Sequence, residues 1–543
     1  MRLSATKILL LIILFALAIR VLGLFQVAAY DEHCWLGWNE CPIWHPPLSQ
    51  LSHLLFREIF GSFDWVGRSF IVLIGITNLV LVYLLSKKLY NKKAALFAAA
   101  LMAFGAYPLL ASLQLDIDGS FLLLFYLLTT LFFVEYEQTK RSLWLVLAGL
   151  AFGLSLLSKY SGIFILPILG LYHILKNRNI LWSVKTFIPL ALIGLVVFSF
   201  FPLISILTHS ILFQESITHL QGYAGSAAIN IPLLLIQYLL SLIWMGPLLI
   251  GLLALSLIRP RKQDLLSWIW ITLIFVVYTL LNKDNFRPLE RYFIILVAPL
   301  SMIGGNYLSR LNLNKKHLIV LSALTLISLS TLLALNLKGD LLPFYPKEAF
   351  INRALSLDWN FYLPITGSSG PIGFFLNFGA IAFCFISSVA CISLSFIFWS
   401  RKRAISAWLI VIFLAISLSS NLFVVQEFLL SSTSPNINKI SRQLIDYSLS
   451  HELNQPVFVF RNYAFRYYLR EKYGDITPID FELENDEQKV DELVKARGTV
   501  IVVDFPKINE KSIFWQKIQT CKLVKNFEDK KLKLGYIFDC AQI

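Results

Sequence analysis

The sequence has few charged residues. Asp, Glu, Lys and Arg make up 15% of its 543 residues, whereas 57% are hydrophobic, and the mean hydropathy is +0.68. The surface of a soluble globular protein of this size needs far more charge than that. The composition therefore excludes a soluble protein and indicates a polytopic membrane protein.

Cysteine is also scarce, with six residues, which excludes a disulfide-rich scaffold. Cys521 and Cys540 flank an expected hairpin whose turn falls at residues 529–531, so we expect them to face each other on adjacent strands. A disulfide there is permitted if this part of the chain lies outside the cell. Cys34 and Cys41 share one loop and form a second candidate pair, although closeness in sequence does not establish the geometry that a disulfide needs.

Apolar runs, in contrast, are abundant. They are about 15 to 28 residues long, near the roughly 20 residues with which a helix crosses a bilayer. The first run follows Arg2 and Lys7 as in a signal peptide, but it is long and no small-residue cleavage site precedes Asp31, so we expect a membrane anchor. Run length predicts about thirteen spans, at residues 8–28, 69–86, 94–113, 119–135, 143–157, 162–175, 186–207, 231–257, 266–281, 292–308, 317–336, 372–399 and 405–423.

The net charge of +14 and the pI near 9.3 would suggest a nucleic-acid partner in a soluble protein. Here many of the basic residues gather in short loops between alternate apolar runs, which is the pattern of cytoplasmic loops. We therefore expect no nucleic-acid partner, a cytoplasmic N-terminus and, because the number of spans is odd, an extracytoplasmic C-terminus. These loops carry Lys87, Lys88, Lys92, Lys93, Lys140, Arg141, Lys176, Lys185, Arg259, Arg261, Lys262, Arg310, Lys315, Lys316, Arg401, Lys402 and Arg403.

Two of the expected spans, 143–157 and 162–175, are short for a full crossing. If they formed one long helix, every later basic loop would lie outside, against the positive-inside rule. We therefore expect a helical hairpin with Lys159 at its outer tip.

The composition changes after about Phe423, where apolar runs give way to short strands and charged helices. This change divides the chain into a transmembrane domain, residues 1–423, and an extracytoplasmic domain, residues 424–543. The fold class is thus mainly α, a transmembrane helical bundle with a C-terminal soluble α/β domain, whose role the sequence leaves open: it could bind an acceptor, another subunit or nothing. The expected strands are 457–460, 476–480, 500–504, 523–527 and 534–538, and the expected helices lie near 438–451, 462–472, 486–497 and 509–518.

Asp31 and Glu32 directly follow the first apolar run. A carboxylate beside hydrocarbon costs free energy, so it is usually functional, paired or exposed in a loop. We favour a functional carboxylate because His45-Pro46-Pro47-Leu48 follows in the same loop. The prolines restrict the backbone, and His45 is a candidate contact for a phosphate or an acceptor.

A second acidic group, Asp116 and Asp118, lies between the third and fourth spans, on the same side as Asp31. Two carboxylates at i and i+2 between apolar runs resemble a metal or sugar-hydroxyl site, although such a triplet alone is a weak signal. Either residue is also suited to cap the following helix. The two interpretations are compatible and weigh about evenly.

Several cations also lie on the outer side, against the general bias, so each needs a partner. A phosphate or diphosphate leaving group would supply one, because fixed cations stabilise developing negative charge. Alternatively, some of them pair with nearby carboxylates such as Glu290 or extend to the interface. The candidates are Arg68, Lys159, Arg287 and Arg291, with Tyr292 beside the last.

Asp31-Glu32 after the first span, the His45–Leu48 motif and residues 115–118 leading into an apolar run together resemble the GT-C superfamily of membrane glycosyltransferases. Within it the chain is most similar to the protein O-mannosyltransferase and aminoarabinose transferase branch, the dolichyl-phosphate-mannose-protein mannosyltransferase family. The resemblance covers about residues 1–310 and not the C-terminal domain. Each motif alone is weak, and the combination is specific.

This resemblance implies a first extracytoplasmic loop packed over the bundle, a donor sugar on a polyprenyl phosphate, and inversion at the anomeric carbon. It implies that Asp31 is the general base, with Glu32 beside it, and that Asp118 matches the second acidic residue of the family better than Asp116. Asp116 departs from the family pattern and leaves open a divalent metal ion held by Asp116 and Asp118. The residues expected near the donor phosphate are His45, Arg68, Lys159, Arg287, Arg291 and Tyr292.

Our first hypothesis is a glycosyltransferase of the plasma membrane that acts at the outer face on an acceptor hydroxyl of a protein, lipid or glycan of the cell envelope. The alternative is a transporter or lipid flippase, in which charged residues would line the span interiors. Inverted repeats of the transporter kind are not visible. A third hypothesis is a non-catalytic receptor. The sequence identifies neither the sugar nor the acceptor.

Overall fold

The structure, a computed structural model, divides into two compact units. The helical unit comprises Met1–Leu24, Cys41–Leu324 and Ser387–Asn421, and the sheet unit comprises Phe25–Glu40, Thr325–Ile386 and Leu422–Ile543. The structure describes residues 4–29, 32, 35, 45–61, 63–115, 117–178, 180–209, 211–222, 231–257, 260–281, 289–365, 373–399, 402–460, 462, 464–474, 476–479 and 484–541; among these it does not describe the side chains of 117–118, 180–183, 219–222, 231–237, 239–244, 281 and 289–290.

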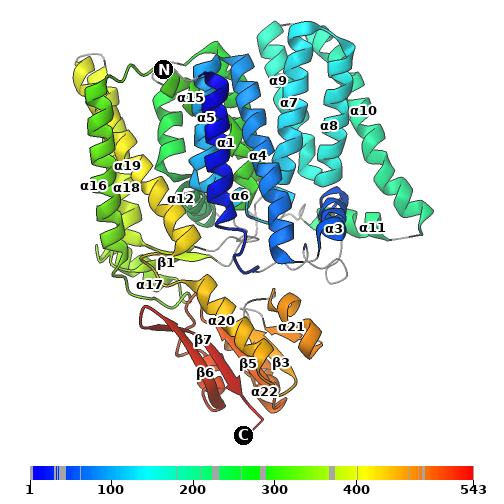
Figure 1. The fold of residues 1–543 in the computed structure, drawn as a ribbon. Helices are drawn as coiled ribbons and strands as arrows, with labels where there is room; N and C mark the ends of the chain where they lie inside the picture. The colour runs from blue at the N-terminus through cyan, green and yellow to red at the C-terminus, as the bar shows by residue number, and fades with distance from the viewer. Residues whose placement is uncertain are drawn as a thin grey trace. The chain divides into compact units, whose positions relative to one another are not determined.

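The predicted spans fall on helices (Figure 1), with three corrections. The helix of the first run ends at Val21, so residues 22–28 are not helical, and Gly105 divides the run 94–113 between two helices. The third correction concerns residues 372–399. Residues 374–377 of that run form a strand, and its helix begins at Phe378. The helices of the membrane part are α1 Ala5–Val21, α3 Leu48–Phe60, α4 Asp64–Leu89, α5 Lys92–Phe104, α6 Ala106–Ala111, α7 Leu122–Thr139, α8 Ser142–Ser158, α9 Ile165–Asn177, α10 Ile180–Leu207, α11 Leu212–Gly222, α12 Ile231–Ser256, α13 Leu265–Leu281, α14 Leu289–Tyr292, α15 Val297–Ser309, α16 Lys315–Asn336, α17 Glu348–Leu355, α18 Phe378–Trp399 and α19 Arg403–Leu430.

Seven helices in the described part of the chain are long and apolar enough to cross a membrane. Shorter apolar helices accompany them, among them Ser142–Ser158 and Phe293–Ser309. Small residues allow close packing between several of these helices, as in other membrane bundles: a Cβ at Gly305 would lie 2.5 Å from the backbone N of Ala98. The long helices are Asp64–Leu89, Gly119–Thr139, Val184–Leu207, Lys262–Leu280, Lys315–Asn336, Phe378–Trp399 and Arg403–Leu430.

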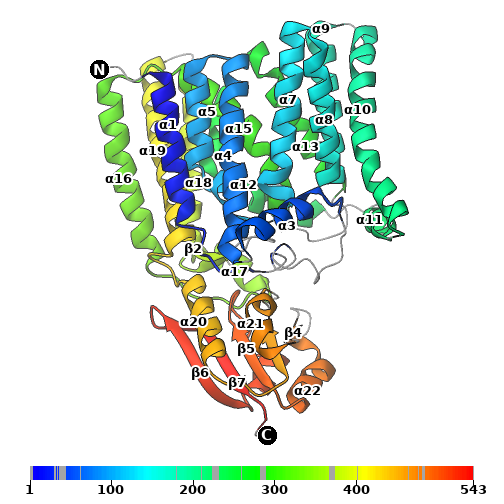
Figure 2. The same cartoon turned by 45° about the vertical axis from the view of Figure 1, so that its right-hand side comes forward.

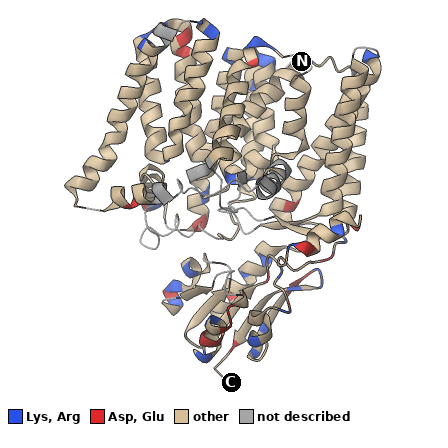
Figure 3. Ribbon diagram, turned by 180° about the vertical axis from the view of Figure 1, so that it is seen from behind, with Lys and Arg blue, Asp and Glu red and all other residues tan. Residues whose placement is uncertain are grey.

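The predicted hairpin around Lys159 is confirmed. Glu137, near the end of α7, accepts hydrogen bonds from Lys140 Nζ (3.2 Å) and from Asn177 Nδ2 (3.3 Å), the last residue of α9. Because α8 begins at Ser142, just after α7, the start of α8 and the end of α9 lie together, and Lys159 lies at the opposite end. Figure 3 shows Lys and Arg residues, coloured blue on the ribbon, gathered at the first of these two ends.

The sheet unit contains the predicted α/β elements. Its five strands lie in the order β4-β3-β5-β7-β6, with β3 parallel to β4 and β5, and β7 antiparallel to β5 and β6. A separate hairpin pairs β1 with β2, which the sequence did not predict. The bounds are β1 Tyr362–Ile365, β2 Phe374–Asn377, α20 Ile437–Ser450, β3 Val457–Phe460, α21 Phe465–Tyr473, β4 Ile476–Ile479, α22 Glu487–Lys495, β5 Thr499–Val503, α23 Ile513–Ile518, β6 Lys522–Asp529 and β7 Leu532–Asp539.

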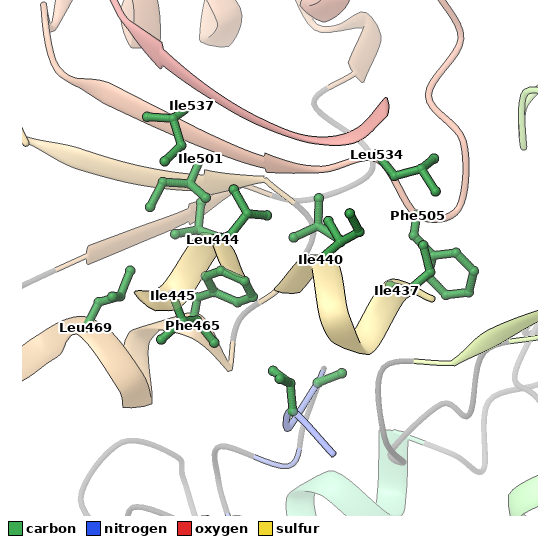
Figure 4. Close-up of a cluster of buried hydrophobic side chains, with 14 of the residues drawn as sticks. Ile437, Ile440, Leu444, Ile445, Phe465, Leu469, Ile501, Phe505, Leu534 and Ile537 are labelled. Atoms are coloured by element: carbon green, nitrogen blue, oxygen red, sulfur yellow. The ribbon is translucent and has the colours of Figure 1, made fainter. Parts of the chain in front are cut away.

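Side chains alternate between two cores along the central strand β5. Ile501 and Val503 pack into a core with residues of α20 and α21 (Figure 4), whereas Val500 and Val502 pack into a second core with residues of α22 and α23. This is the period of two that a strand imposes. Because both faces are covered by helices, β5 is apolar from Val500 to Val503, as a central strand in an α/β sheet should be.

Cys521 and Cys540 form a disulfide at the open end of the β6–β7 hairpin, with their Cα atoms 4.6 Å apart. At the other end the predicted turn is confirmed: Lys530 and Lys531 have φ values of 49° and 67°, the left-handed pair typical of a two-residue hairpin turn. Cys34 and Cys41 lie outside the described residues.

Candidate active site

The first loop begins at the end of the segment Phe25–Ala29. Glu32 is fully buried; its backbone N–H donates to the Ala29 carbonyl (3.1 Å), and its Oε2 accepts from the Ala29 N–H (3.2 Å). The bond from the Ala29 N–H to the Glu32 carboxylate is one half of a capping box, so the carboxylate closes the turn between the two residues. Asp31 lies outside the described residues, and its role as the base stays a prediction.

The prolines of the His45–Leu48 motif lead directly into α3, and half-buried His45 precedes them. This helix was not predicted from the sequence. Its polar residues Ser49 and His53 are buried, whereas its exposed residues are apolar except for Glu58, as in helices that lie in a membrane interface. Figure 2 shows α3 lying across the direction of the neighbouring helices. The missed signal was spacing by four residues: the exposed apolar residues are Leu51, Leu55, Ile59 and Phe60.

Arg68 lies against the second loop of the bundle. Its side chain is fully buried in the second turn of α4, and Nη1 donates to the Leu113 carbonyl oxygen at 2.5 Å. Asn78, farther along α4, donates from Nδ2 to the Ser120 carbonyl oxygen at 2.7 Å. The helix α4 therefore holds both ends of the segment that carries Asp116 and Asp118.

That segment ends in a π-helical turn, Ile117–Phe121, at the start of α7. Gly119 in this turn departs from helical geometry (φ −76°, ψ −134°), and a Cβ there would lie 3.1 Å from the Ala111 carbonyl oxygen. Turns of this kind are frequent at functional sites. Asp116 and the side chain of Asp118 lie outside the described part, so the predictions of a metal site and of a helix cap stay predictions.

Lys159, Arg291 and Tyr292 come together although they lie more than a hundred residues apart. The Nζ of buried Lys159 lies 4.7 Å from the centre of the Tyr292 ring, and the guanidinium carbon of Arg291 lies 5.0 Å from it. Arg291 Nη2 also donates to Tyr292 Oη at 3.2 Å. We call these three residues the cationic cluster. Two cations against one ring create strong positive potential, which the π electrons offset only in part.

The cationic cluster lies beside the second acidic loop. The turn Phe293–Leu296 and helix α14, which carries Arg291 and Tyr292, both pack against Ile117–Phe121. The structure thus brings Arg68, the backbone of Asp118, Lys159, Arg291 and Tyr292 to one region of the helical unit. Arg287 lies outside the described residues.

The residues that support the cationic cluster were not predicted from the sequence. Tyr278 stacks on Tyr292, with ring centres 5.3 Å apart. The Tyr126 hydroxyl donates to the carbonyl oxygen of Ser161, at 2.6 Å. Ser161 lies two residues after Lys159. Gly162 follows, and a Cβ there would lie 2.6 Å from the Ser155 carbonyl oxygen, so the turn needs glycine. Only the conspicuous Gly after Lys159 could have been read from the sequence.

Arg20 has a structural position instead of a place in the cluster. It is buried in α1 and donates to Ser112 Oγ (2.7 Å) and to the carbonyl oxygens of Met102 (3.1 Å) and Ala103 (3.0 Å). These carbonyls lie where α5 ends before α6. A buried guanidinium needs several acceptors, and Arg20 finds them at this break in the backbone.

Metal ligands are not gathered in the described part of the chain, where no group of three or more His, Cys, Asp or Glu residues is placed to hold an ion. Asp116 and the Asp118 side chain are outside that search. Metal use is therefore untested, and no step proposed below requires a metal.

Solved structures share this fold along the whole chain. The crystal structure of ArnT from Cupriavidus metallidurans bound to undecaprenyl phosphate matches with a TM-score of 0.58 at 15% identity, covering 98% of each chain. The structure of the same protein in the apo state matches with a TM-score of 0.57 at 15% identity, covering 99% of each chain. At this identity the likeness establishes the fold alone.

A family match in sequence supports the predicted class of protein. Residues 44–204 match the family described as dolichyl-phosphate-mannose-protein mannosyltransferase, and this stretch contains His45, Arg68 and Lys159. No curated protein matches the chain in sequence. The predicted resemblance is thus confirmed, and the chain is a multi-pass membrane glycosyltransferase.

Proposed function

We propose that the chain transfers a sugar from a polyprenyl-phosphate-linked donor to an acceptor hydroxyl at the outer face of the membrane, with inversion at the anomeric carbon. The observation that carries the proposal is the cationic cluster beside the second acidic loop. Fixed cations are suited to a leaving phosphate because they stabilise the negative charge that develops on it. The family match supports a donor of this class, as does the undecaprenyl phosphate bound by ArnT of C. metallidurans.

The reaction needs one base and several cations. Asp31 takes the proton of the acceptor hydroxyl, and the acceptor oxygen attacks the anomeric carbon. The bond between that carbon and the phosphate oxygen breaks, and its electron pair leaves with the polyprenyl phosphate. Lys159 and Arg291 stabilise this phosphate, and Tyr292 holds both cations in place.

The other predicted site residues have supporting roles in this proposal. Glu32 keeps the turn before the base closed through its bonds to Ala29. Asp118, beside the cationic cluster, orients a hydroxyl of the sugar or the acceptor. His45, Arg68 and Arg287 extend the positive surroundings of the donor phosphate.

The proposed location is the plasma membrane, with a cytoplasmic N-terminus and residues 424–543 outside. The acceptor is a hydroxyl of a protein, lipid or glycan. The gathering of Lys and Arg at one end of the helical unit supports this orientation, because such loops stay on the cytoplasmic side (Figure 3).

Asp31→Asn tests the proposal. The purified chain in lipid nanodiscs is given a polyprenyl-phosphate sugar with a radiolabel in the sugar, and transfer to an acceptor extract is counted. We expect turnover to fall by about a thousandfold or more, because loss of a general base typically costs a factor of 10² to 10⁴. The matched control is Asp64→Asn, whose carboxylate lies in the first turn of α4 and accepts from the Trp65 N–H; it should stay within about twofold of wild type. Full transfer by Asp31→Asn would remove Asp31 as the base.

A further inference from the structure

The segment Phe25–Ala29, which leads into the first loop, is held inside the sheet unit. Val27 and Ala29 are completely buried in the same apolar core as α20 and α21. Figure 4 shows this N-terminal segment in blue beside α20, near Ile437 and Ile440. Chain segments more than 400 residues apart in sequence thus share one core.

Side chains of the sheet unit bind the backbone of this segment. Asn438 Oδ1 accepts from the Val27 N–H at 2.6 Å, and Tyr468 Oη accepts from the Ala28 N–H at 2.8 Å. Arg442 Nη2 donates to the Phe25 carbonyl oxygen at 3.1 Å. In addition, the Gln26 side chain donates from Nε2 to the Phe428 carbonyl oxygen at 2.7 Å.

These hydrogen bonds fix the register of Phe25–Ala29 as well as its burial. An apolar core accepts many arrangements of similar volume, whereas consecutive backbone N–H groups bound to two fixed side chains allow one register. Buried backbone donors also need partners, because an unpaired one is not compensated for the water it has lost. Asn438 on α20 and Tyr468 on α21 therefore fix where this segment lies along the sheet unit.

The turn closed by Glu32 follows immediately. The Glu32 carboxylate accepts from the Ala29 N–H, and the Glu32 N–H donates to the Ala29 carbonyl oxygen, so the position of Ala29 sets the position of Glu32. Asp31 is two residues after Ala29, and covalent geometry keeps their Cα atoms within about 7 Å of each other. Displacing Ala29 therefore displaces the start of the first loop.

We propose that the C-terminal α/β domain is a positioning element for catalysis: α20 and α21 hold Phe25–Ala29 so that the first loop presents its acidic pair to the acceptor. The inference rests on the proposed role of Asp31 as the base. Asn438 and Tyr468 are positioning residues, because they act through the backbone of the loop. The domain thereby has a role in the transfer step itself.

Two substitutions in the full chain test this. Asn438→Ala and Tyr468→Phe each remove one acceptor, and we expect kcat to fall by about tenfold to a hundredfold, because misplacement of a reacting group by about 1 Å costs as much. The KM for the polyprenyl-phosphate sugar should stay within about twofold, since the donor phosphate binds elsewhere. Asn438→Asp keeps an oxygen that accepts from the Val27 N–H and should restore most of kcat.

Matched controls come from the same domain. Asn454→Ala removes a side-chain bond to Asp539, and Tyr536→Phe removes one to the Lys533 carbonyl oxygen, and neither residue binds Phe25–Ala29. Both controls should keep wild-type kcat. Thermal unfolding of all variants shows whether the domain remains folded.

A double-mutant cycle separates positioning from general stability. If Asn438 acts through Asp31, Asn438→Ala costs nothing further in an Asp31→Asn background, where residual transfer is followed over long incubations. An equal loss in both backgrounds would overturn the inference, as would wild-type kcat in both Asn438→Ala and Tyr468→Phe while Asp31→Asn is inactive. Full transfer by Asp31→Asn would instead mark the failure of the proposed base, and the inference would fall with it.

Discussion

The ring of Tyr292 has two separable roles in the cationic cluster. Its face lies near both Lys159 and Arg291, and its hydroxyl accepts a hydrogen bond from Arg291. We expect Tyr292→Phe, which keeps the face, to lower kcat/KM by about threefold, since a hydrogen bond of this kind contributes about 0.5–1.5 kcal/mol. Tyr292→Leu removes the face and should cost about thirtyfold or more, because two cations then lose their common partner.

The measurement is steady-state transfer with a labelled donor, and Tyr136→Leu is the control. Tyr136 also lies under a lysine, Lys140, but at the opposite end of the hairpin. Equal losses in Tyr292→Phe and Tyr292→Leu would show that the hydroxyl alone matters.

Individual site residues were predictable where chemistry made them conspicuous. Arg68, Lys159 and Arg291 stand out because they are cations on the predicted outer side, where cations are uncommon. The structure brings them to one region. The hydrogen bond between the Glu32 carboxylate and the Ala29 N–H was not predictable. A carboxylate next to Asp31 gives the same sequence pattern whether it binds substrate or closes a turn. Tyr278 was hidden among the aromatic residues of an apolar run.

The β6–β7 turn and α20 are joined by Asp529. Its Oδ1 lies 2.8 Å from Lys439 Nζ, and its Oδ2 accepts from the Asn436 N–H at 3.0 Å. Burial alone would raise the pKa of the Asp529 carboxyl, but these two bonds lower it below its ordinary value. A lowered pKa means that the stabilisation is present above the unfolded pKa of about 3.9 and is lost as the pH falls through the folded pKa.

We therefore expect Asp529→Asn to lower the local free energy of unfolding at pH 7 by about 1–2 kcal/mol. Hydrogen exchange of the β6–β7 and α20 amides in the full chain measures this. The difference from wild type should shrink below about pH 4. Asp446→Asn, at an exposed position on α20, should show no such change. A difference that is independent of pH would contradict the assignment.

Elements with a strong single period were predictable. The strands of the five-stranded sheet alternate between two cores or lie between turn residues, and their predicted bounds agree with the structure to within two residues. The helix α3 was missed because its pattern is inverted, with the apolar face exposed, and because the prolines before it suggest a loop. Strand β2 was absorbed into an apolar run, since Phe374, Phe375 and Leu376 continue the composition of α18 without a break.

The whole molecule has a topology that reporter fusions can check. With an odd number of spans and a cytoplasmic N-terminus, alkaline phosphatase fused after Ile543 should be active in bacterial cells, because it folds only in an oxidising compartment. The same enzyme fused after Lys316, in a basic loop, should be inactive. The reverse pattern would invert the proposed orientation and place the disulfide between Cys521 and Cys540 in the cytoplasm.

The overall architecture was predictable from the length of the apolar runs and from the charge pattern. The packing of Phe25–Ala29 against α20 and α21 was not. The amino-acid sequence of Phe25–Ala29 does not show that Asn438 and Tyr468 bind the backbone of this segment, because backbone groups are nearly the same in every residue. The sequence accordingly suggested a domain boundary near Phe423, whereas the structure places Phe25–Glu40 in the unit that contains the C-terminal sheet.

Polyprenyl-phosphate binding tests the central claim most directly. Native mass spectrometry of the purified chain with undecaprenyl phosphate gives the dissociation constant for wild type, Lys159→Gln and Arg291→Gln, with Lys316→Gln as the control for lost charge. If the cationic cluster holds the donor phosphate, both cluster variants bind at least about tenfold more weakly, since a hydrogen bond to a charged group contributes about 1.5–3 kcal/mol, and the control binds as wild type does. Wild-type affinity in Lys159→Gln and Arg291→Gln would contradict the claim.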